Sequence, residues 1–111
     1  MDVSRLAPPV SVIIPCHNAA PYIGQAVASV LEQTGLPAGF ELEIVIADDR
    51  SDDGATQAVL AELAGRHAQV RVVGNDGARG PGPARNFAVR HAHGRWLAFL
   101  DADDWWLPGS L

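Results

Sequence analysis

The sequence predicts an α/β fold, in which a parallel β-sheet carries helices on both of its faces. Two observations lead to this prediction. Four short apolar segments alternate with three amphipathic patterns of helical period, which gives the order β-α-β-α-β-α-β. Strands and helices that alternate at this spacing form parallel sheets through right-handed crossovers. The second and fourth apolar segments also end directly at carboxylates, and in such a sheet all strand ends of this kind share one edge, where ligands bind.

The four predicted strands are apolar segments that end at prolines, glycines or acids. They are residues 10–14, 43–47, 70–73 and 96–100. The first is β-branched and is stopped by Pro15, which cannot donate to a sheet ladder. The second stops at Asp48 and Asp49.

Three helices are expected between these strands. The first begins at Pro21, which suits an initial helical turn, and runs to Gln33, after which Gly35, Pro37 and Gly39 end it. Apolar residues at positions 55–63 predict the second helix, with Ser51 or Asp53 as its cap. Residues 75–83 are rich in glycine and proline and predict an irregular loop close to a ligand. One apolar face over residues 84–91 then predicts a third, shorter helix that ends near Gly94.

Composition restricts the class of protein. With 111 residues, 48% hydrophobic and 19% charged, the chain is expected to form one soluble globular domain. No apolar run approaches the ~20 residues of a membrane-spanning helix, and residues 1–9 form a tail without the apolar core of a signal peptide. We therefore expect a cytoplasmic location, with any peripheral attachment to a membrane made through regions outside this chain.

Charge and residue usage exclude several functions. A net charge of −5 argues against nucleic acid as a partner, because phosphate contacts need clustered positive charge. All eight basic residues are Arg, and the absence of Lys excludes the P-loop nucleotide binders. The single cysteine, Cys16, excludes an intrachain disulfide and a cysteine-based zinc site, and we expect it to pack as a small hydrophobe.

Three acids in four residues, Asp101, Asp103 and Asp104, follow the last predicted strand. Carboxylates so close repel one another unless a cation or a ligand's donors compensate them. A divalent metal, held by oxygen atoms and open to water and a phosphate-bearing substrate, is the simplest compensator. The alternative is that Asp103 or Asp104 caps a helix that begins at Trp105.

Four stretches, taken together and in order, resemble the inverting, nucleotide-sugar-dependent glycosyltransferases of family 2, which have the Rossmann-like GT-A fold. They are Val-Ser-Val-Ile-Ile-Pro-Cys-His-Asn (10–18), Asp-Asp-Arg-Ser-Asp-Asp-Gly (48–54), Ala-Arg-Asn (84–86) and Phe-Leu-Asp-Ala-Asp-Asp (99–104). The resemblance covers residues 10–106. It implies that residues 10–111 are the nucleotide-sugar-binding half of such a domain.

The resemblance also implies roles for single residues. Asp49 matches the contact to the nucleobase, usually uracil, and Pro15 matches the backbone beside the base. Arg85 matches a basic residue near the diphosphate, where its permanently charged fork suits phosphate oxygens. Asp101 would lie near the ribose and the metal, and Asp103 would ligate an Mn²⁺ or Mg²⁺ ion that bridges the two phosphates.

Residues next to these positions allow less specific predictions. Asp104 resembles an outer partner of the metal site or a cap. Asp48 is expected to have the structural role in the pair that it forms with Asp49. His17 is expected to be a turn or core histidine. Trp105 and Trp106 are expected to pack in the core or against a helix, with an acceptor wall as the alternative.

The chain departs from the family pattern in places. Arg50 and Ala88 each stand where the family usually has Gly, and Ala55 stands where Thr or Ser is common. These changes are expected to affect loops more than chemistry. The family's acceptor-binding half, with its catalytic Asp or Glu, would follow Leu111. We therefore expect donor and metal binding without transfer, and self-association through apolar surface that the missing half would cover.

Two other functions compete with a sugar transferase. A non-catalytic nucleotide-binding or assembly module would use the same residues, and the sequence beyond Leu111 separates it from an enzyme. A phosphoryl-transfer domain is the second alternative, because haloacid-dehalogenase-like phosphatases and response receivers also have acids at strand ends. Both of these classes use a lysine, which this chain lacks.

Overall fold

The computed structural model describes residues 10–33 and 41–110, so the tail at residues 1–9 and the helix breakers at 35, 37 and 39 lie outside the described residues. The elements, in chain order, are β1 (Val10–Cys16), α1 (Ala20–Leu31), β2 (Leu42–Asp48), α2 (Gly54–Arg66), β3 (Val70–Gly74), α3 (Pro81–Arg90) and β4 (Trp96–Phe99). The predicted alternation of strands and helices is confirmed.

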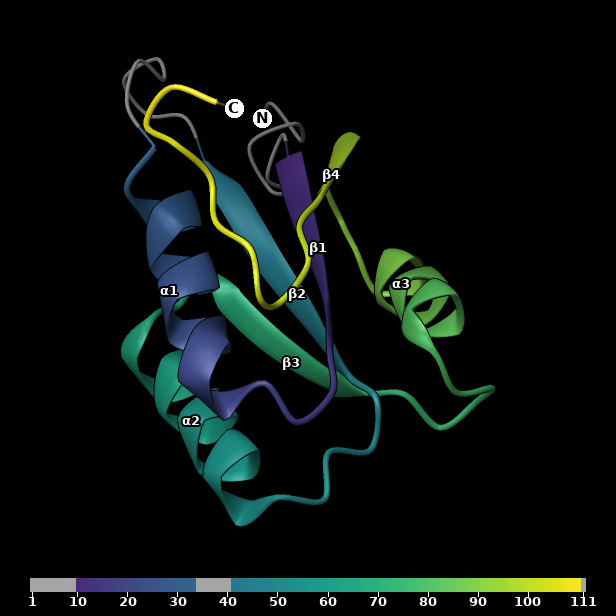
Figure 1. Cartoon of the computed structure of the whole chain (residues 1–111). Helices are drawn as coiled ribbons and strands as arrows, with labels where there is room; N and C mark the ends of the chain where they lie inside the picture. The colour runs from purple at the N-terminus through teal and green to yellow at the C-terminus, as the bar shows by residue number, and fades with distance from the viewer. Residues whose placement is uncertain (1–9, 34–40, 111) are drawn as a thin grey trace.

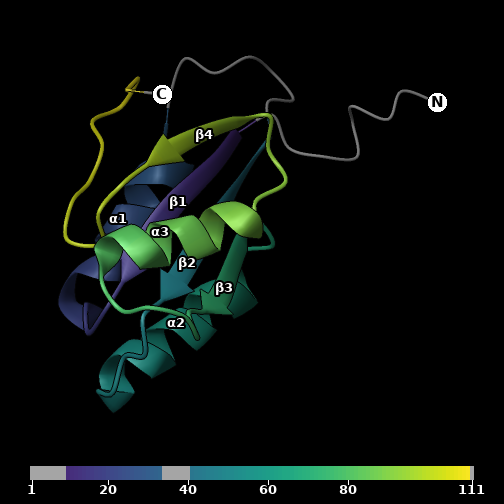
Figure 2. The same cartoon turned by 90° about the vertical axis from the view of Figure 1, so that its right-hand side faces the viewer.

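The four strands form one parallel sheet in the order β3-β2-β1-β4. Helices α1 and α2 cover one face, and α3 lies across the other (Figures 1 and 2). The predicted α/β fold with helices on both faces is therefore confirmed. Because the chain leaves β1 toward β2 but returns to the far side of β1 as β4, the carboxyl ends of β1 and β4 form a topological switch point, where α/β sheets bind ligands.

Alternate residues of the central strands supply two apolar layers. Even-numbered residues of β1 and β2 pack with α1 and α2, and include Val12, Ile14 and Ile44. Odd-numbered residues such as Ile13 and Val45 face α3 and pack with its small residues. Burial on both faces explains why these strands are continuous apolar runs in the sequence.

Strand β1 continues two residues beyond its predicted end. Pro15 pairs with Ala47 of β2, and the strand ends at Cys16. The main chain of Ile13 faces β4, since its carbonyl accepts from the Leu100 N–H at 3.1 Å. Pro15 points to the same side, beyond the last β1–β4 pair, so its missing N–H interrupts no ladder bond.

Helix α3 begins at Pro81, three residues earlier than predicted, and so includes part of the expected irregular loop. It ends at Arg90, before the end predicted near Gly94, because Gly94 belongs to the segment that binds Ser11 and enters β4. Pro81 and Pro83 lie in its first turn, where backbone N–H groups have no partner within the helix. Helix α2 has the expected cap, because the Asp53 carboxylate accepts from the Thr56 N–H at 2.6 Å.

No helix begins at Trp105 in the described chain, which runs to residue 110, so the capping interpretation of the acids is wrong. The Asp104 N–H instead donates to the Asp101 carbonyl at 3.0 Å in a turn, and the chain then runs along α1. Trp106 packs against the core, and its N–H donates to the Ser29 hydroxyl at 3.0 Å. Trp105 is 53% exposed, so the expected packing holds for Trp106 and is wrong for Trp105.

Among the helices of residues 10–33 and 41–110, none combines the length and the apolar character needed to cross a membrane.

Candidate functional site

A pocket of about 520 Å³ opens at the carboxyl edge of the sheet. Three segments that are distant in sequence form it: the turn after β1, the start of α3 and the chain after β4, with Asp49 from the end of β2 between them. Every site residue expected from the sequence lines this one pocket: Pro15, Asp49, Arg85, Asp101 and Asp103.

Asp49 is a buried carboxylate that is held on both oxygens. Its Oδ1 accepts from Asn75 Nδ2 at 2.9 Å, and its Oδ2 accepts from the Gly80 N–H at 2.8 Å. Burial acts to raise its pKa, but these two donors, with His17 and Arg50 nearby, lower the pKa below its ordinary value. Asp49 is therefore an ionised acceptor at neutral pH, and its oxygens keep lone pairs for an N–H donor of a ligand.

Asn75 and Gly80 are functional candidates that sequence reasoning did not single out. The only signal in the sequence was the glycine-rich stretch itself, in which Asn75 follows the third strand directly. Their importance depends on a contact with Asp49, which lies 26 and 31 residues away in the chain.

The turn after β1 is joined firmly to the segment after β2. Asn18 adopts a left-handed backbone conformation with φ of 48°, and its side-chain oxygen accepts from the N–H groups of Asp52 and Asp53 at 3.0 and 3.2 Å. His17, which is exposed, has Nδ1 2.9 Å from the Asp49 carbonyl, so Nδ1 is the donor. The expectation of a turn histidine therefore fits its position.

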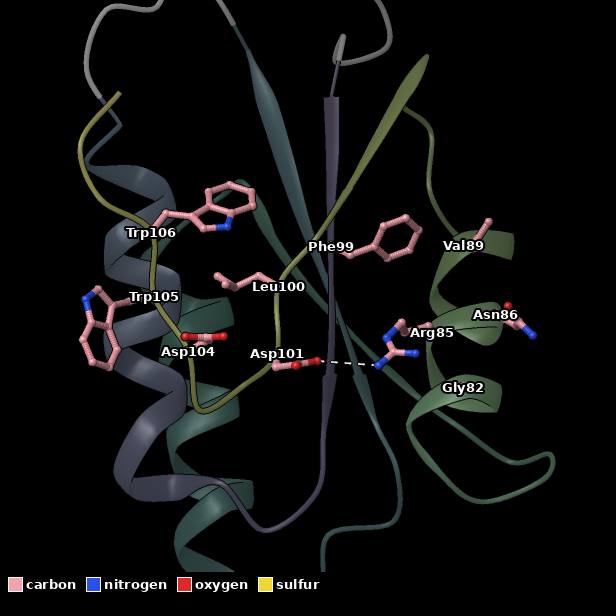
Figure 3. A pocket seen from close by; sticks show the side chains of 10 residues that line it. All are labelled: Gly82, Arg85, Asn86, Val89, Phe99, Leu100, Asp101, Asp104, Trp105 and Trp106. Carbon is pink, nitrogen blue, oxygen red and sulfur yellow. Dashed lines mark ion pairs between the residues drawn. The ribbon is translucent and has the colours of Figure 1, made fainter. Parts of the chain in front are cut away.

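Arg85 and Asp101 face each other across the pocket. Arg85 extends from α3, and its Nη2 lies 3.6 Å from Oδ1 of Asp101, just after β4 (Figure 3). Both side chains are partly exposed, so the pair contributes little to stability and both groups remain accessible to a ligand. A cation that binds Asp101 would take the place of Arg85, and an anion that binds Arg85 would take the place of Asp101.

The donor set can be compared with the needs of Mn²⁺ or Mg²⁺. Asp101 and Asp103 are exposed carboxylates on the same pocket. Among the described residues there is no group of three or more His, Cys, Asp or Glu side chains arranged to hold a metal ion. Mg²⁺ nevertheless binds typically through one or two carboxylates together with waters and substrate phosphates. The residues present fit such a shared site and do not form a complete protein cage.

Cys16 also lines the pocket, yet the residue is only 1% exposed. Burial, assisted by the nearby Asp48 carboxylate, raises the pKa of Cys16 to about 11. The thiol is therefore neutral and unreactive at physiological pH, as expected for a packed residue.

A second groove, of about 640 Å³, adjoins the first at Arg85 and Asp101. Figure 3 shows it along β4, with Phe99 directed toward α3 and with Leu100 and Trp106 on the other side of the strand. Asp104 lines this groove and not the first pocket, so the structure separates it from Asp103.

Comparison with known proteins gives matches along almost the whole chain. The sequence model of glycosyl transferase family 2 matches residues 11–111. Succinoglycan biosynthesis protein ExoO of Rhizobium meliloti (strain 1021) is 39% identical over 104 residues, which are 94% of this chain and 28% of ExoO. The Escherichia coli UDP-Glc:alpha-D-GlcNAc-diphosphoundecaprenol beta-1,3-glucosyltransferase WfgD is 37% identical over 102 residues, which are 92% of this chain and 38% of WfgD. The chain thus spans less than two fifths of each relative.

Solved structures show the same similarity. The mannosyltransferase PcManGT from Pyrobaculum calidifontis, in complex with GDP-Man and Mn²⁺, superposes with a TM-score of 0.76 at 34% identity, over 93% of this chain and 30% of that one. S. aureus TarS 1-349 gives a TM-score of 0.71 at 34% identity, over 86% of this chain and 28% of that one. TarS has also been solved with UDP and with UDP-GlcNAc. With its parallel sheet and the family match over residues 11–111, this chain belongs to glycosyl transferase family 2 and carries the N-terminal part of its GT-A fold.

Proposed function

We propose that this chain binds the nucleotide-diphosphate-sugar donor and its metal ion in an inverting glycosyltransferase. The observation that carries the proposal is the single pocket in which Asp49, Arg85, Asp101 and Asp103 meet at the carboxyl edge of the sheet. Its acids and its guanidinium suit the three parts of such a donor, which are a base with N–H groups, a diphosphate and a bridging cation.

Asp49 is proposed to accept a hydrogen bond from the ring N–H of the base, with the backbone at Pro15 beside it. An ionised carboxylate is acceptor-only, so it favours a base edge that offers an N–H, as uracil does. UDP-containing donors are supported by WfgD, whose name specifies UDP-Glc, and by TarS with UDP-GlcNAc. PcManGT with GDP-Man shows that a relative uses another base.

Arg85 is proposed to bind the diphosphate, and Asp101 and Asp103 to hold the cation between it and the protein. The bound cation would stabilise negative charge on the leaving nucleoside diphosphate. Exchange of the Arg85–Asp101 pair for ligand contacts keeps both side chains neutralised, so the nucleotide and the cation should each favour binding of the other.

Inverting transfer also needs a general base for the acceptor hydroxyl. The three acids that line the pocket are proposed to serve the donor and the metal, so we propose that the general base lies outside these 111 residues. Sugar transfer should accordingly be absent from these 111 residues and present in a protein that includes the acceptor-binding half.

Metal dependence is tested by calorimetric titration of UDP in Mn²⁺ and in chelator. Loss of a charged ligand in a partly desolvated site costs about 2 kcal/mol, so Asp103→Ala should weaken UDP affinity in Mn²⁺ at least ~10-fold. Asp76→Ala, which removes an exposed acid outside the pocket, is the matched control and should bind as wild type. Equal binding in chelator, or an Asp103→Ala protein that binds as tightly as wild type, would contradict the metal assignment.

The role of Asp49 is tested by discrimination among bases. Asp49→Ala should reduce the preference for UDP over other nucleoside diphosphates while affinity for inorganic diphosphate with Mn²⁺ stays unchanged. A variant that keeps the wild-type order of preference would reject the base assignment. Turnover of a UDP-sugar by the 111-residue chain alone would show that the general base lies within it.

A further inference from the structure

Asn75 is a buried polar residue at the start of the loop between β3 and α3, and it is only 3% exposed. Its amide nitrogen donates to Asp49 Oδ1 and to the Ala78 carbonyl, both at 2.9 Å. Its side-chain oxygen accepts from the Gly77 N–H at 3.2 Å. One side chain therefore stabilises its own loop and holds the carboxylate that follows the neighbouring strand, β2.

The same loop also holds the other oxygen of that carboxylate. Gly80, with φ of 116°, directs its N–H to Asp49 Oδ2 at 2.8 Å. Two donors on two oxygens fix both the position and the plane of the carboxylate group. Positive φ is a conformation that glycine adopts without strain, so the loop can make this contact directly before α3.

We propose that Asn75 is the positioning residue that orients Asp49 for recognition of the donor's base. This inference rests on the proposed function of Asp49 and assigns to the loop at residues 75–80 a part in donor specificity. Asn75 itself does not line the pocket, whereas Asp49 and Gly80 do, so its effect on a ligand would pass through Asp49.

Electrostatics support the geometry. Burial acts to raise the pKa of Asp49, and the donors from Gly80 and Asn75, followed by the nearby charges of His17 and Arg50, lower it. Loss of the Asn75 donor should let this pKa rise. Because a protonated carboxyl presents fewer acceptor sites, base recognition should then fail at a higher pH than in wild type.

The experiment compares UDP with inorganic diphosphate, each titrated calorimetrically in Mn²⁺. Asn75→Ala should weaken UDP binding about 10-fold while diphosphate affinity stays within about 2-fold, because the contact that is lost serves the base alone. Asn75→Asp has nearly the same shape but apposes a second carboxylate to Asp49, so we expect a larger loss for UDP. Asp76→Ala, in the same loop but exposed, is the matched control and should change neither affinity.

Thermal unfolding of each variant is measured first. Should Asn75→Ala not fold, Asn75→Ser serves for the same comparison, because its shorter side chain loses the amide donor to Asp49 Oδ1 and still offers a hydroxyl to the surrounding loop. A UDP titration from neutral to acidic pH adds a readout that a scaffold role would not change: the loss of affinity should begin at higher pH in the variant than in wild type.

The possible failures are distinct. A parallel loss of UDP and diphosphate affinity, or an unchanged preference for UDP in all Asn75 variants, overturns the positioning role and leaves the proposed function intact. A wild-type chain that shows no preference for UDP over inorganic diphosphate overturns the function proposed for Asp49, and the positioning role with it.

Discussion

Two buried carboxylates, one within β2 and one just after it, illustrate how surroundings decide the role of a residue. Asp49 follows the carboxyl end of β2 and lines the pocket, whereas Glu43 lies near the opposite end of the same strand. Glu43 Oε2 accepts from the Ser11 hydroxyl and the His93 N–H, both at 2.6 Å, and Oε1 lies 3.2 Å from Arg71. Arg71 also donates to the His91 carbonyl. Glu43 thus joins the chain that enters β4 to the centre of the sheet.

Glu43 should make stability depend on pH. Burial acts to raise its pKa, but the donors of His93 and Ser11, with Arg71, lower it from 4.5. A lowered pKa gives stability that is present above pH 4.5 and is lost as pH falls through the folded-state value. Glu43→Gln should destabilise the fold by about 2 kcal/mol at pH 7 and flatten this acid limb, as measured by urea unfolding from pH 7 to 3. Glu62→Gln, at an exposed ion pair with Arg66, should leave the limb unchanged.

Sequence reasoning identified residues whose chemistry is visible in a short motif. Asp101, Asp103 and Asp49 follow apolar runs, and their meeting at one edge followed from a parallel sheet alone. Asn18 and Asn75 were not singled out, because an isolated asparagine in a turn has no distinctive pattern. Their roles come from tertiary hydrogen bonds to segments 26 to 35 residues away.

At the scale of elements, the existence and type of all seven elements in the described residues were predictable from the sequence, because apolar segments alternate with patterns of helical period. The central strands β1 and β2 are continuous apolar runs because they are buried on both faces. Boundaries failed at prolines. Pro15 can lie within β1 because its position without an N–H faces the β4 side, beyond the last residue pair of β1 and β4. Pro81 can begin α3 because N–H groups in the first turn of a helix have no partner within the helix. The sequence alone does not show where the pairing with a neighbouring strand ends, and therefore whether a proline can be accommodated in the strand.

The entry into β4 depends on one close approach. At Gly94 an added Cβ would lie 2.5 Å from the Ser11 hydroxyl oxygen and 2.8 Å from the Val10 carbonyl carbon, and the Gly94 N–H donates to that hydroxyl at 2.7 Å. Gly94→Ala should therefore destabilise the fold by about 2 kcal/mol in denaturant unfolding. Gly65→Ala is the matched control: it lies in α2, its Cβ meets nothing within 4 Å, and it should be neutral or stabilising by up to about 1 kcal/mol. Equal effects of the two changes would show that the backbone contact at Gly94 is not tight.

At the scale of the molecule, the sequence predicted a parallel sheet but not the order of its strands. The strand order depends on which face of the sheet each helix covers. The amphipathic pattern of a helix shows that it packs on the sheet but not on which face. It leaves β4 at an edge, paired on one side with β1 and without a partner on the other among the described residues. Trp96, Leu97 and Phe99 of this strand are 69, 43 and 51% exposed, and they alternate between its two faces.

An open edge that is apolar on both faces favours strand addition between copies. The 111-residue chain should therefore form dimers or larger species as its concentration rises, measured by sedimentation velocity over a hundredfold range. Replacing Trp96 and Phe99 by Lys puts charge on both faces of β4, away from the first pocket, and should shift the chain toward monomer while UDP affinity persists. Leu107→Lys is the control, because Leu107 is 70% exposed but follows β4 and should not alter association. Wild type that stays monomeric throughout, or association that the β4 change leaves intact, would show that this edge does not mediate self-association.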